Sequence, residues 1–258
     1  MNATFGTRLS SASLYVLLPV VLLVLWQILF ELGVIRALLL PPPSKIAQTF
    51  IVLLANGDLL RHLGISLVRV LEGFVLASAA GLVLGIAIGL SRALDHCTDL
   101  IIQLIKPIPP IAWIPLTILW FGIGEESKVF IIFLGAFFPI LINTIDGIRQ
   151  TDVRYVELAR ILETTRTRFI TRVVLPGALP QIMTGLRVGM MVAWMCVVAA
   201  ELIAASSGIG FLIMDARQMM QTDQVFVGMI TIGATGKLLD VLLKKVECRL
   251  IGWKAEFR

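Results

Sequence analysis

Residues 73–90, GFVLASAAGLVLGIAIGL, form an apolar stretch without a single charged side chain. A stretch of this length is typical of a helix that spans a lipid bilayer. Gly81, Gly85 and Gly89 recur at every fourth position, which places them on one face of the expected helix. Such a face lets a second helix approach closely. The alternative interpretation is a lipid-facing helix whose glycines are incidental.

The composition of the whole chain agrees with a membrane protein. Of its 258 residues, 58% are hydrophobic and 15% are charged, a balance that would keep a soluble domain of this length poorly dissolved. Further apolar segments cover residues 14–32, 100–121, 129–148, 179–205 and 225–243. We therefore predict an all-α membrane protein with six transmembrane helices, in which residues 1–258 form a single transmembrane domain.

The third apolar segment, residues 100–121, is the one that prolines interrupt. Pro107, Pro109, Pro110 and Pro115 each lack a backbone N–H, so this segment must kink or break. Freed backbone groups are tolerated at membrane depth only where protein or water covers them. We expect a broken span here.

The distribution of basic residues predicts the orientation. With six spans, both termini lie on one side of the membrane, together with the loop at about residues 149–176. That side would hold most of the basic residues, namely Arg8, Arg92, Arg149, Arg154, Arg160, Arg166, Arg168, Arg172, Lys244, Lys245, Arg249, Lys254 and Arg258. The positive-inside rule assigns it to the cytoplasm. Topology thus explains the net charge of +5, and no basic stretch has the interleaved aromatics expected for nucleic-acid binding.

The loop itself has helical periodicity. Tyr155, Leu158, Ala159 and Leu162 recur at i, i+3, i+4 and i+7, which predicts a short amphipathic helix within residues 151–164. A second helix follows over residues 166–174, and we expect residues 175–177, Leu-Pro-Gly, to end it. Two helices joined at a bend would form a compact protrusion. It could dock a soluble partner, or rest on anionic lipid through its arginines.

The loop also resembles the cytoplasmic signature of the inner-membrane permease subunits of binding-protein-dependent ABC importers. That signature runs Glu-Ala-Ala, three residues, Gly, nine residues, then Ile, any residue and Leu-Pro. Here Glu157-Leu158-Ala159 leads through Glu163 to Leu175-Pro176 with the same spacing. Leu158 replaces an alanine, and Glu163 replaces the glycine at the bend. A glutamate there either adopts less favourable backbone angles or shifts the bend to residues 164 and 165.

Other stretches resemble the branch of this family that imports taurine and other sulfonates, nitrate and bicarbonate. They are KPIPPIAWIP at residues 106–115, WFGIGE at 120–125, AAELIA at 199–204 and SGIG at 207–210. The resemblance covers nearly the whole chain from about Leu40. It implies a type I ABC importer permease fold in the inner membrane of a bacterial cell. The residues it implies for coupling to the ATPase are Tyr155, Glu157, Leu158, Ala159, Leu162, Glu163, Thr164, Leu175 and Pro176.

The partners implied by the resemblance are a second copy of the chain, two cytoplasmic ABC ATPase subunits, and a periplasmic or lipid-anchored substrate-binding protein. The chain has no Gly-x-x-x-x-Gly-Lys-Ser/Thr phosphate loop, since Gly236-Lys237 is followed by Leu238. We therefore expect ATP and Mg on the partner ATPase and no cofactor, metal or catalytic residue on this chain. The alternative is a secondary transporter that works without ATP. Inverted repeats of broken helices would favour that alternative. Only one segment of this chain is clearly broken, which argues against it.

Ionisable side chains inside the spans are candidates for the substrate pathway, because an ionised group there tends to face protein or water. Lys106 and Arg187 could offset the charge of an anionic cargo, such as taurine or another sulfonate, with nitrate or bicarbonate as alternatives. They could equally snorkel towards a boundary or pair with Glu201. Trp113 fits either the lining of the pathway or an interfacial anchor.

Overall fold

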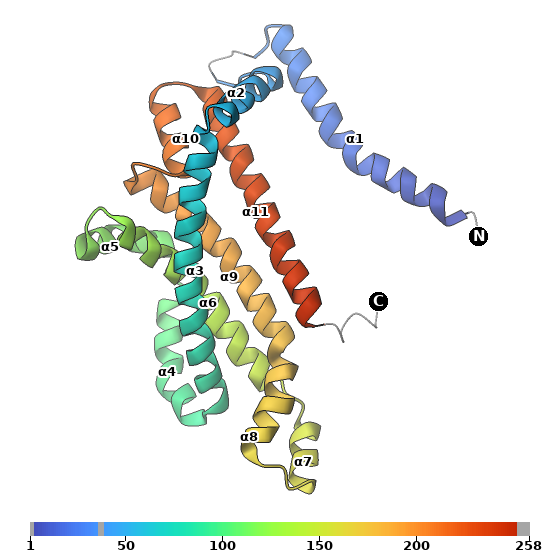
Figure 1. Cartoon of the computed structure of the whole chain (residues 1–258), viewed down its shortest axis with the longest axis vertical. Coiled ribbons are helices and arrows are strands. Elements are labelled where there is room, and N and C mark those ends of the chain that lie inside the picture. Colours follow the sequence, from blue (N-terminus) through green and yellow to red (C-terminus); the bar gives the residue numbers. More distant parts are fainter. Residues whose placement is uncertain (1–2, 36–38, 252–258) are drawn as a thin grey trace. The chain divides into compact units, whose positions relative to one another are not determined.

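The computed structural model describes residues 3–35 and 39–251, with side chains described from residue 17 onward except at Val153, Val156, Leu158 and Arg160. Within these residues the chain is helical and contains no strand (Figure 1). The elements are α1 (Ala3–Glu31), α2 (Pro43–Ala55), α3 (Asp58–Leu90), α4 (Arg92–Ile105), η1 (Pro110–Trp113), α5 (Ile114–Phe121), α6 (Glu125–Arg149), α7 (Val153–Ile161), α8 (Arg166–Phe169), η2 (Ile170–Val174), α9 (Leu175–Ala204), α10 (Ile209–Gln218) and α11 (Thr222–Leu250).

The chain divides into two compact units, of which the first comprises Met1–Arg61 and Leu212–Thr231. Within this unit, the Thr49 hydroxyl of α2 donates a hydrogen bond to Asp223 at the start of α11, at 2.6 Å. Trp26 of α1 and Phe226 of α11 bring their ring centroids to 5.6 Å. Both α1 and α2 are therefore attached to the first turns of α11.

The second unit, His62–Phe211 and Ile232–Arg258, is built around α6 and α9. These two helices run antiparallel and approach closely at glycines. A methyl group added to Gly135 would lie 2.6 Å from the sulfur of Cys196, and one added to Gly185 would lie 2.7 Å from Cβ of Asn143. Buried Ile132, Ile140 and Val197 belong to the core cluster that lies against this seam.

The glycine face of α3 packs against α6. A methyl group added to Gly81 would meet Ile140 at 3.0 Å, and one added to Gly85 would meet Thr144 at 2.7 Å. Gly73 faces Ile132 and Gly89 faces Ile148 in the same manner, so residue numbers rise together and the helices run parallel. The predicted close-packing face is confirmed, and the alternative of incidental glycines facing lipid is wrong.

The prediction of a helical membrane protein is confirmed. Four helices or continuous helical segments are long and apolar enough to cross a bilayer, namely Asp58–Leu90, Glu125–Arg149, Arg166–Ala204 and Thr222–Leu250. Arg92–Ile105 and Pro110–Phe121 pass the same test as a pair bent by 85°, which is the break expected in the third segment. The described apolar part of α1, Leu17–Glu31, is shorter and lies within the first predicted span.

One sequence-based expectation about the loop is wrong. Leu175-Pro176-Gly177 does not end the second loop helix, because the chain stays helical from Arg166 to Ala204. Residues Ile170–Val174 form a π-helical turn directly before the first residue of α9, Leu175. Pro176 lies in the first turn of α9. A proline is tolerated in the first turn of a helix. The loop therefore continues into a span without interruption.

Candidate functional site

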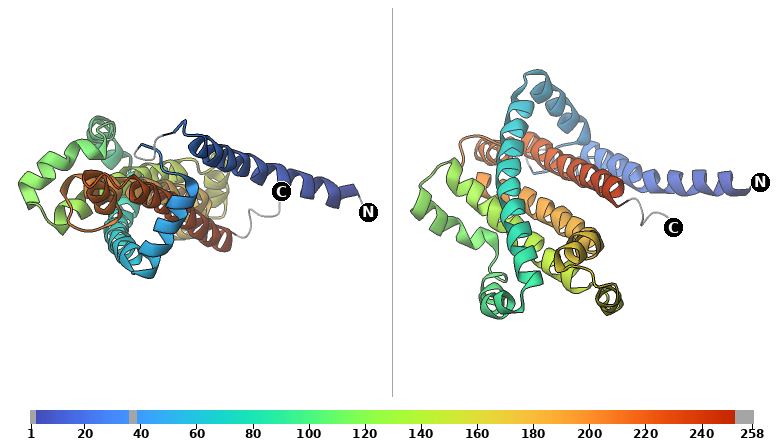
Figure 2. Two further views of the ribbon diagram at one scale, coloured as in Figure 1. Left: turned by 90° about the horizontal axis from the view of Figure 1, so that it is seen from above. Right: turned by 60° about the horizontal axis from the view of Figure 1, so that its bottom comes forward.

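The predicted protrusion is present as α7 and α8, which follow α6 and precede α9 at one end of the second unit (Figure 1). The right view of Figure 2 turns this end toward the reader. Asp152 initiates α7 by accepting a hydrogen bond from the backbone N–H of Arg154, at 2.9 Å. An aspartate in this position is a typical helix N-cap. The two helices and the bend between them agree with the sequence-based prediction.

The bend lies at Glu163. This residue has a φ of +49°, in the left-handed region that favours glycine. Directly after it, the backbone N–H of Thr164 donates to the carbonyl oxygen of Ala159 at 2.9 Å, which closes the C-terminus of α7. Glu163 thus adopts the less favourable backbone angles, and the bend does not shift to residues 164 and 165. It stays at the position where the signature of the resembled permeases has glycine.

Exposed apolar side chains cover the protrusion. Tyr155, Ile161 and Leu162 have 56%, 78% and 66% of their surface exposed. Glu157 is also exposed, on the face of α7 that it shares with Ile161 one turn later. The side chain of Leu158 lies outside the described part. A group of large exposed apolar side chains next to a charged one is typical of a surface that meets a partner.

The other predicted coupling residues lie elsewhere on this end. Ala159 is half-buried, Glu163 and Thr164 are exposed, and Leu175 and Pro176 are half-buried in the first turn of α9. Next to them, Val174 is buried in a cluster with Ile148, Ala178 and Ile182. This cluster fixes the base of the protrusion to both α6 and α9.

A polar cavity of about 600 Å³ lies between the protrusion and the adjoining ends of α6 and α9. Its lining includes Gln150, Asp152, Tyr155, Arg172 and Gln181. Tyr155 is thus both exposed and part of the lining of this cavity. The protrusion does not rest flush on the helices that carry it.

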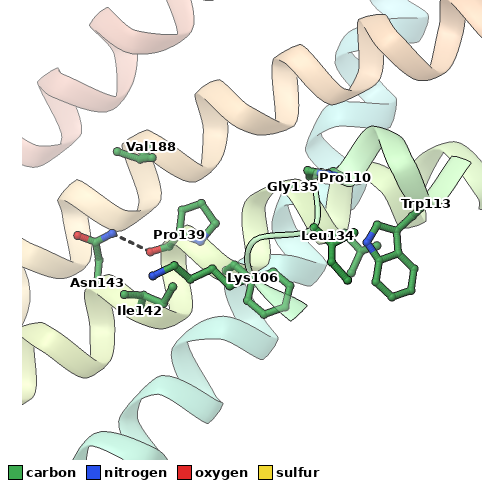
Figure 3. A pocket seen from close by; sticks show the side chains of 11 residues that line it. Lys106, Pro110, Trp113, Leu134, Gly135, Pro139, Ile142, Asn143 and Val188 are labelled. Atoms are coloured by element: carbon green, nitrogen blue, oxygen red, sulfur yellow. Dashed lines mark hydrogen bonds between the residues drawn. The ribbon is translucent and has the colours of Figure 1, made fainter. Parts of the chain in front are cut away.

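Two of the four predicted pathway residues, Lys106 and Trp113, line a common pocket of about 340 Å³. The rest of its wall is mainly α6, with Leu134, Phe138 and Asn143 among the lining residues. Figure 3 shows the Lys106 side chain extended along the pocket with its amino group toward Asn143. Sequence reasoning identified the lysine but not the asparagine next to it.

The amide of Asn143 is held in a fixed orientation. Its Nδ2 donates to the carbonyl oxygen of Pro139 at 2.8 Å, one helical turn earlier. Its Oδ1 accepts from Nε2 of Gln181 at 3.1 Å. One hydrogen of the Asn143 amide nitrogen is left for another acceptor, since the group carries two.

Arg187, a third predicted pathway residue, is held by α11. Its Nη2 lies 2.8 Å from Asp240 and its Nη1 lies 3.1 Å from Glu247. The two carboxylates neutralise the guanidinium, and Arg187 is absent from the lining of the Lys106 pocket. The pair with Glu201 that the sequence allowed is not formed.

Glu201, the fourth predicted pathway residue, is 1% exposed and belongs to a polar cluster at the other end of α9. It accepts hydrogen bonds from the Ser66 hydroxyl at 2.8 Å, from Nη1 of Arg69 at 2.7 Å and from the backbone N–H of Gly210 at 2.9 Å. A methyl group added to Gly208, whose φ is +113°, would overlap this carboxylate. The glycines of residues 207–210 are therefore required by the glutamate.

Arg69, which sequence reasoning missed, is the centre of this cluster. Its N–H groups donate to Glu201, to both carboxylate oxygens of Glu125, and to the carbonyl and hydroxyl oxygens of Ser207. All five donors of the guanidinium are thereby used. The cluster joins α3, the start of α6 and the end of α9. The available signal was a lone arginine four residues before the apolar stretch that begins at Gly73.

Among the described residues, no three His, Cys, Asp or Glu side chains lie close enough together to hold an ion. The cysteines Cys97, Cys196 and Cys248 are all free thiols. The geometry thus provides a surface for a partner and a pocket for a ligand.

Comparisons with known proteins agree with this arrangement. Residues 77–251 match the model of the family described as "Binding-protein-dependent transport system inner membrane component". The putative aliphatic sulfonates transport permease protein of Bacillus subtilis is 44% identical over 93% of this chain and 87% of its own length. The taurine transport system permease protein of Escherichia coli is 37% identical, over 92% of this chain and 88% of its own length.

A bicarbonate transport system permease protein of Synechococcus elongatus is 40% identical over 68% of this chain and 63% of its own length. Among solved structures, the inward-facing MetNI methionine ABC transporter aligns with a TM-score of 0.65 and 17% identity. The alignment covers 75% of this chain and 96% of the transporter chain. The fold is thus that of a type I ABC importer permease.

Proposed function

The chain belongs to the family of inner-membrane components of binding-protein-dependent transport systems, and from this premise we propose that it is the permease subunit of an ATP-driven importer of a small anion. The cargo is taurine or another sulfonate, delivered by a periplasmic or lipid-anchored binding protein. Two copies of the chain form the pathway. ATP and Mg are bound by two cytoplasmic ABC ATPase subunits, which perform the hydrolysis.

The observation that carries this proposal is the protrusion formed by α7 and α8. Exposed Tyr155 and Leu162 provide apolar surface for an ATPase, and exposed Glu157 provides a charge on a neighbouring face of α7. The buried cluster around Val174 and Ile148 fixes the base of the protrusion to two spans. When the ATPases close on ATP, movement of the protrusion would therefore tilt α6 and α9 and open the pathway alternately to each side.

The same arrangement supports an orientation with the protrusion in the cytoplasm, and the predicted six spans would place both termini on that side as well. Arg166, Arg168 and Arg172 lie at the protrusion, and Arg149 ends α6 beside it, where it pairs with Asp95 of α4. The cluster of Arg69 with Glu125 and Glu201 lies at the opposite ends of α6 and α9 and is charge-compensated. The excess of positive charge is therefore on the protrusion side, which the positive-inside rule assigns to the cytoplasm.

An anionic cargo is supported by Lys106, whose amino group reaches into the pocket that Trp113 also lines. Bicarbonate is a second candidate, because a relative named for bicarbonate transport is 40% identical over 68% of this chain. A bicarbonate system would use the same coupling surface. The sulfonate importer and the bicarbonate importer would differ only in the anion that they transport.

Reconstitution tests the proposal. The chain, its ATPase and its binding protein are placed in liposomes, and uptake of labelled taurine, an alkanesulfonate and bicarbonate is measured. We expect uptake only with ATP, the ATPase and the binding protein all present. Uptake by the purified chain alone, driven by an ion gradient, would show that it is a secondary transporter instead.

A further inference from the structure

Lys106 occupies an unusual position for a charged residue. It directly follows α4, at the break of the pair Arg92–Ile105 and Pro110–Phe121 that is bent by 85°. Its pocket is lined by residues from Leu134 to Asn143, the middle of α6, and by Val188 from the middle of α9. The pocket therefore lies level with the middle of two helices that are long and apolar enough to span a bilayer. At the centre of a bilayer an ionised side chain facing lipid costs about 2.5–3.5 kcal/mol.

Lys106 also differs from the cations of the second unit that are paired with carboxylates. Arg69 pairs with Glu125 and Glu201, Lys128 pairs with Glu125, and Arg187 pairs with Asp240 and Glu247. Within the described part of the chain, Lys106 has no carboxylate within salt-bridge distance, and no acidic residue lines its pocket. Its positive charge is available to a ligand.

The rest of the pocket is apolar apart from one amide. The Asn143 amide lies near the lysine amino group (Figure 3) and has one N–H that takes no part in its two hydrogen bonds. The wall otherwise includes Leu134, Phe138 and Ile142. Trp113 lies away from the Lys106 amino group in the same view. The volume of about 340 Å³ is within the range of small-molecule sites. One end of the pocket thus suits a negative headgroup and the remainder suits a hydrocarbon tail.

From this geometry we propose that the permease itself contains a binding subsite for a singly charged organic anion with a short apolar tail. The anionic headgroup binds the Lys106 ammonium and the free N–H of Asn143, and the tail lies against the α6 wall. This inference rests on the proposed function and adds a second point of selection, within the membrane, to the selection made by the binding protein. Within the sulfonates it favours alkanesulfonates over taurine.

The subsite discriminates against two kinds of anion. Nitrate and bicarbonate are polar on all sides, so an apolar wall would leave most of their oxygen atoms without donors. Taurine has the headgroup of a sulfonate, but its second charge is an ammonium group, which would lie unpaired against the wall. Propanesulfonate has the same number of non-hydrogen atoms as taurine, with a methyl group in place of the ammonium. The two compounds are a matched pair of ligands.

Isothermal titration calorimetry of the permease–ATPase complex tests the inference. The complex is placed in phosphatidylcholine nanodiscs, which contain no anionic lipid to compete, and the binding protein is left out. Along methane-, ethane-, propane- and butanesulfonate we expect Kd to fall about fourfold for each buried methylene. Taurine should bind about tenfold more weakly than propanesulfonate, or worse, because its ammonium is buried unpaired.

Variants assign the binding to this pocket. Lys106→Gln should weaken propanesulfonate binding about tenfold or more, because a charge-assisted bond is lost, whereas Lys106→Arg should retain most of it. Lys45→Gln removes a charge from an exposed lysine of α2 and should leave the Kd for propanesulfonate unchanged. The inference is overturned if nitrate binds as tightly as butanesulfonate, if affinity is independent of tail length, or if Lys106→Gln binds normally.

Failure of the subsite can be told apart from failure of the proposed function. If the titration shows no sulfonate binding while the complete importer still moves the anion into liposomes with ATP, the subsite is wrong and the function stands. If the complete importer moves no anion, the proposed function itself is wrong.

Discussion

Arg69 and Glu201 form an ion pair buried inside the second unit, with Nη1 and Oε1 2.7 Å apart and exposed fractions of 3% and 1%. The two residues come from α3 and from the end of α9. Ser66 and Gly210 donate further hydrogen bonds to the same carboxylate. No water is needed to satisfy either charge, so the pair connects the helix ends rigidly.

The first prediction concerns this pair. Glu201→Ala should lower the free energy of unfolding by about 3–5 kcal/mol, because Arg69 loses one carboxylate and two further buried donors lose their acceptor. The measurement is unfolding of the purified chain in detergent. Glu126→Ala, at an exposed position next to Glu125, is the matched control and should stay within about 0.5 kcal/mol of the wild type. Equal stability of both variants would contradict the role assigned to the cluster.

The second prediction concerns the bend at Glu163. Glu163→Gly should fold and bind the ATPase at least as well as the wild type, because glycine removes a left-handed backbone cost of about 1–2 kcal/mol. Glu163→Val should weaken ATPase binding, since a β-branched residue is a strong outlier at a φ of +49°. Co-purification of the tagged ATPase measures both. Tighter binding by the valine variant than by the glycine variant would disprove the argument.

The third prediction concerns the docking surface. Glu157→Lys should leave membrane insertion intact and reduce co-purification of the ATPase, because it reverses a charge exposed on the same face of α7 as Ile161. Glu126→Lys makes the same change at the opposite end of α6 and should bind the ATPase normally. If the protrusion rested on lipid alone, the two variants would co-purify equal amounts of ATPase.

The fourth prediction compares two glycines of α3. Gly85→Ala should destabilise the chain by about 1–3 kcal/mol, because the new methyl group would lie 2.7 Å from Cβ of Thr144. Gly64→Ala has nothing within 4 Å of the new methyl group and should stabilise the same helix by about 0.5–1 kcal/mol. The melting temperatures of the two variants are measured by thermal unfolding in the same detergent. If both melting temperatures shifted in the same direction, this would count against close packing of α3 on α6.

Local patterns predicted the features that depend on neighbours in sequence. The spacing of Gly81, Gly85 and Gly89 was enough to place a packing face on α3, and the periodicity around Tyr155 was enough to place α7. The prolines after Lys106 were enough to predict the broken span. Each of these features follows from backbone chemistry within a few residues.

Long-range pairing could not be predicted in this way. Nothing in the local sequence says that Arg69 meets Glu201, or that Arg187 meets Asp240 instead of Glu201, because such pairs depend on which helices adjoin. The error at Pro176 has a different cause. A proline at the start of a helix and a proline that ends one can have the same local sequence. In the structure the chain passes through a π-helical turn into α9, and Pro176 lies in the first turn of that helix.

The continuity of α9 through Pro176 has a consequence for energetics. As one helix of residues Leu175–Ala204, with a rise of about 1.5 Å per residue, it is about 45 Å long. Its first turn adjoins the protrusion and its last turn carries Glu201. A ligand that tightens the contacts around Glu201 and an ATPase that tightens the protrusion therefore act on the same continuous helix. Linkage then requires the two affinities to change each other by one common factor, which binding measurements at either end of the molecule can determine.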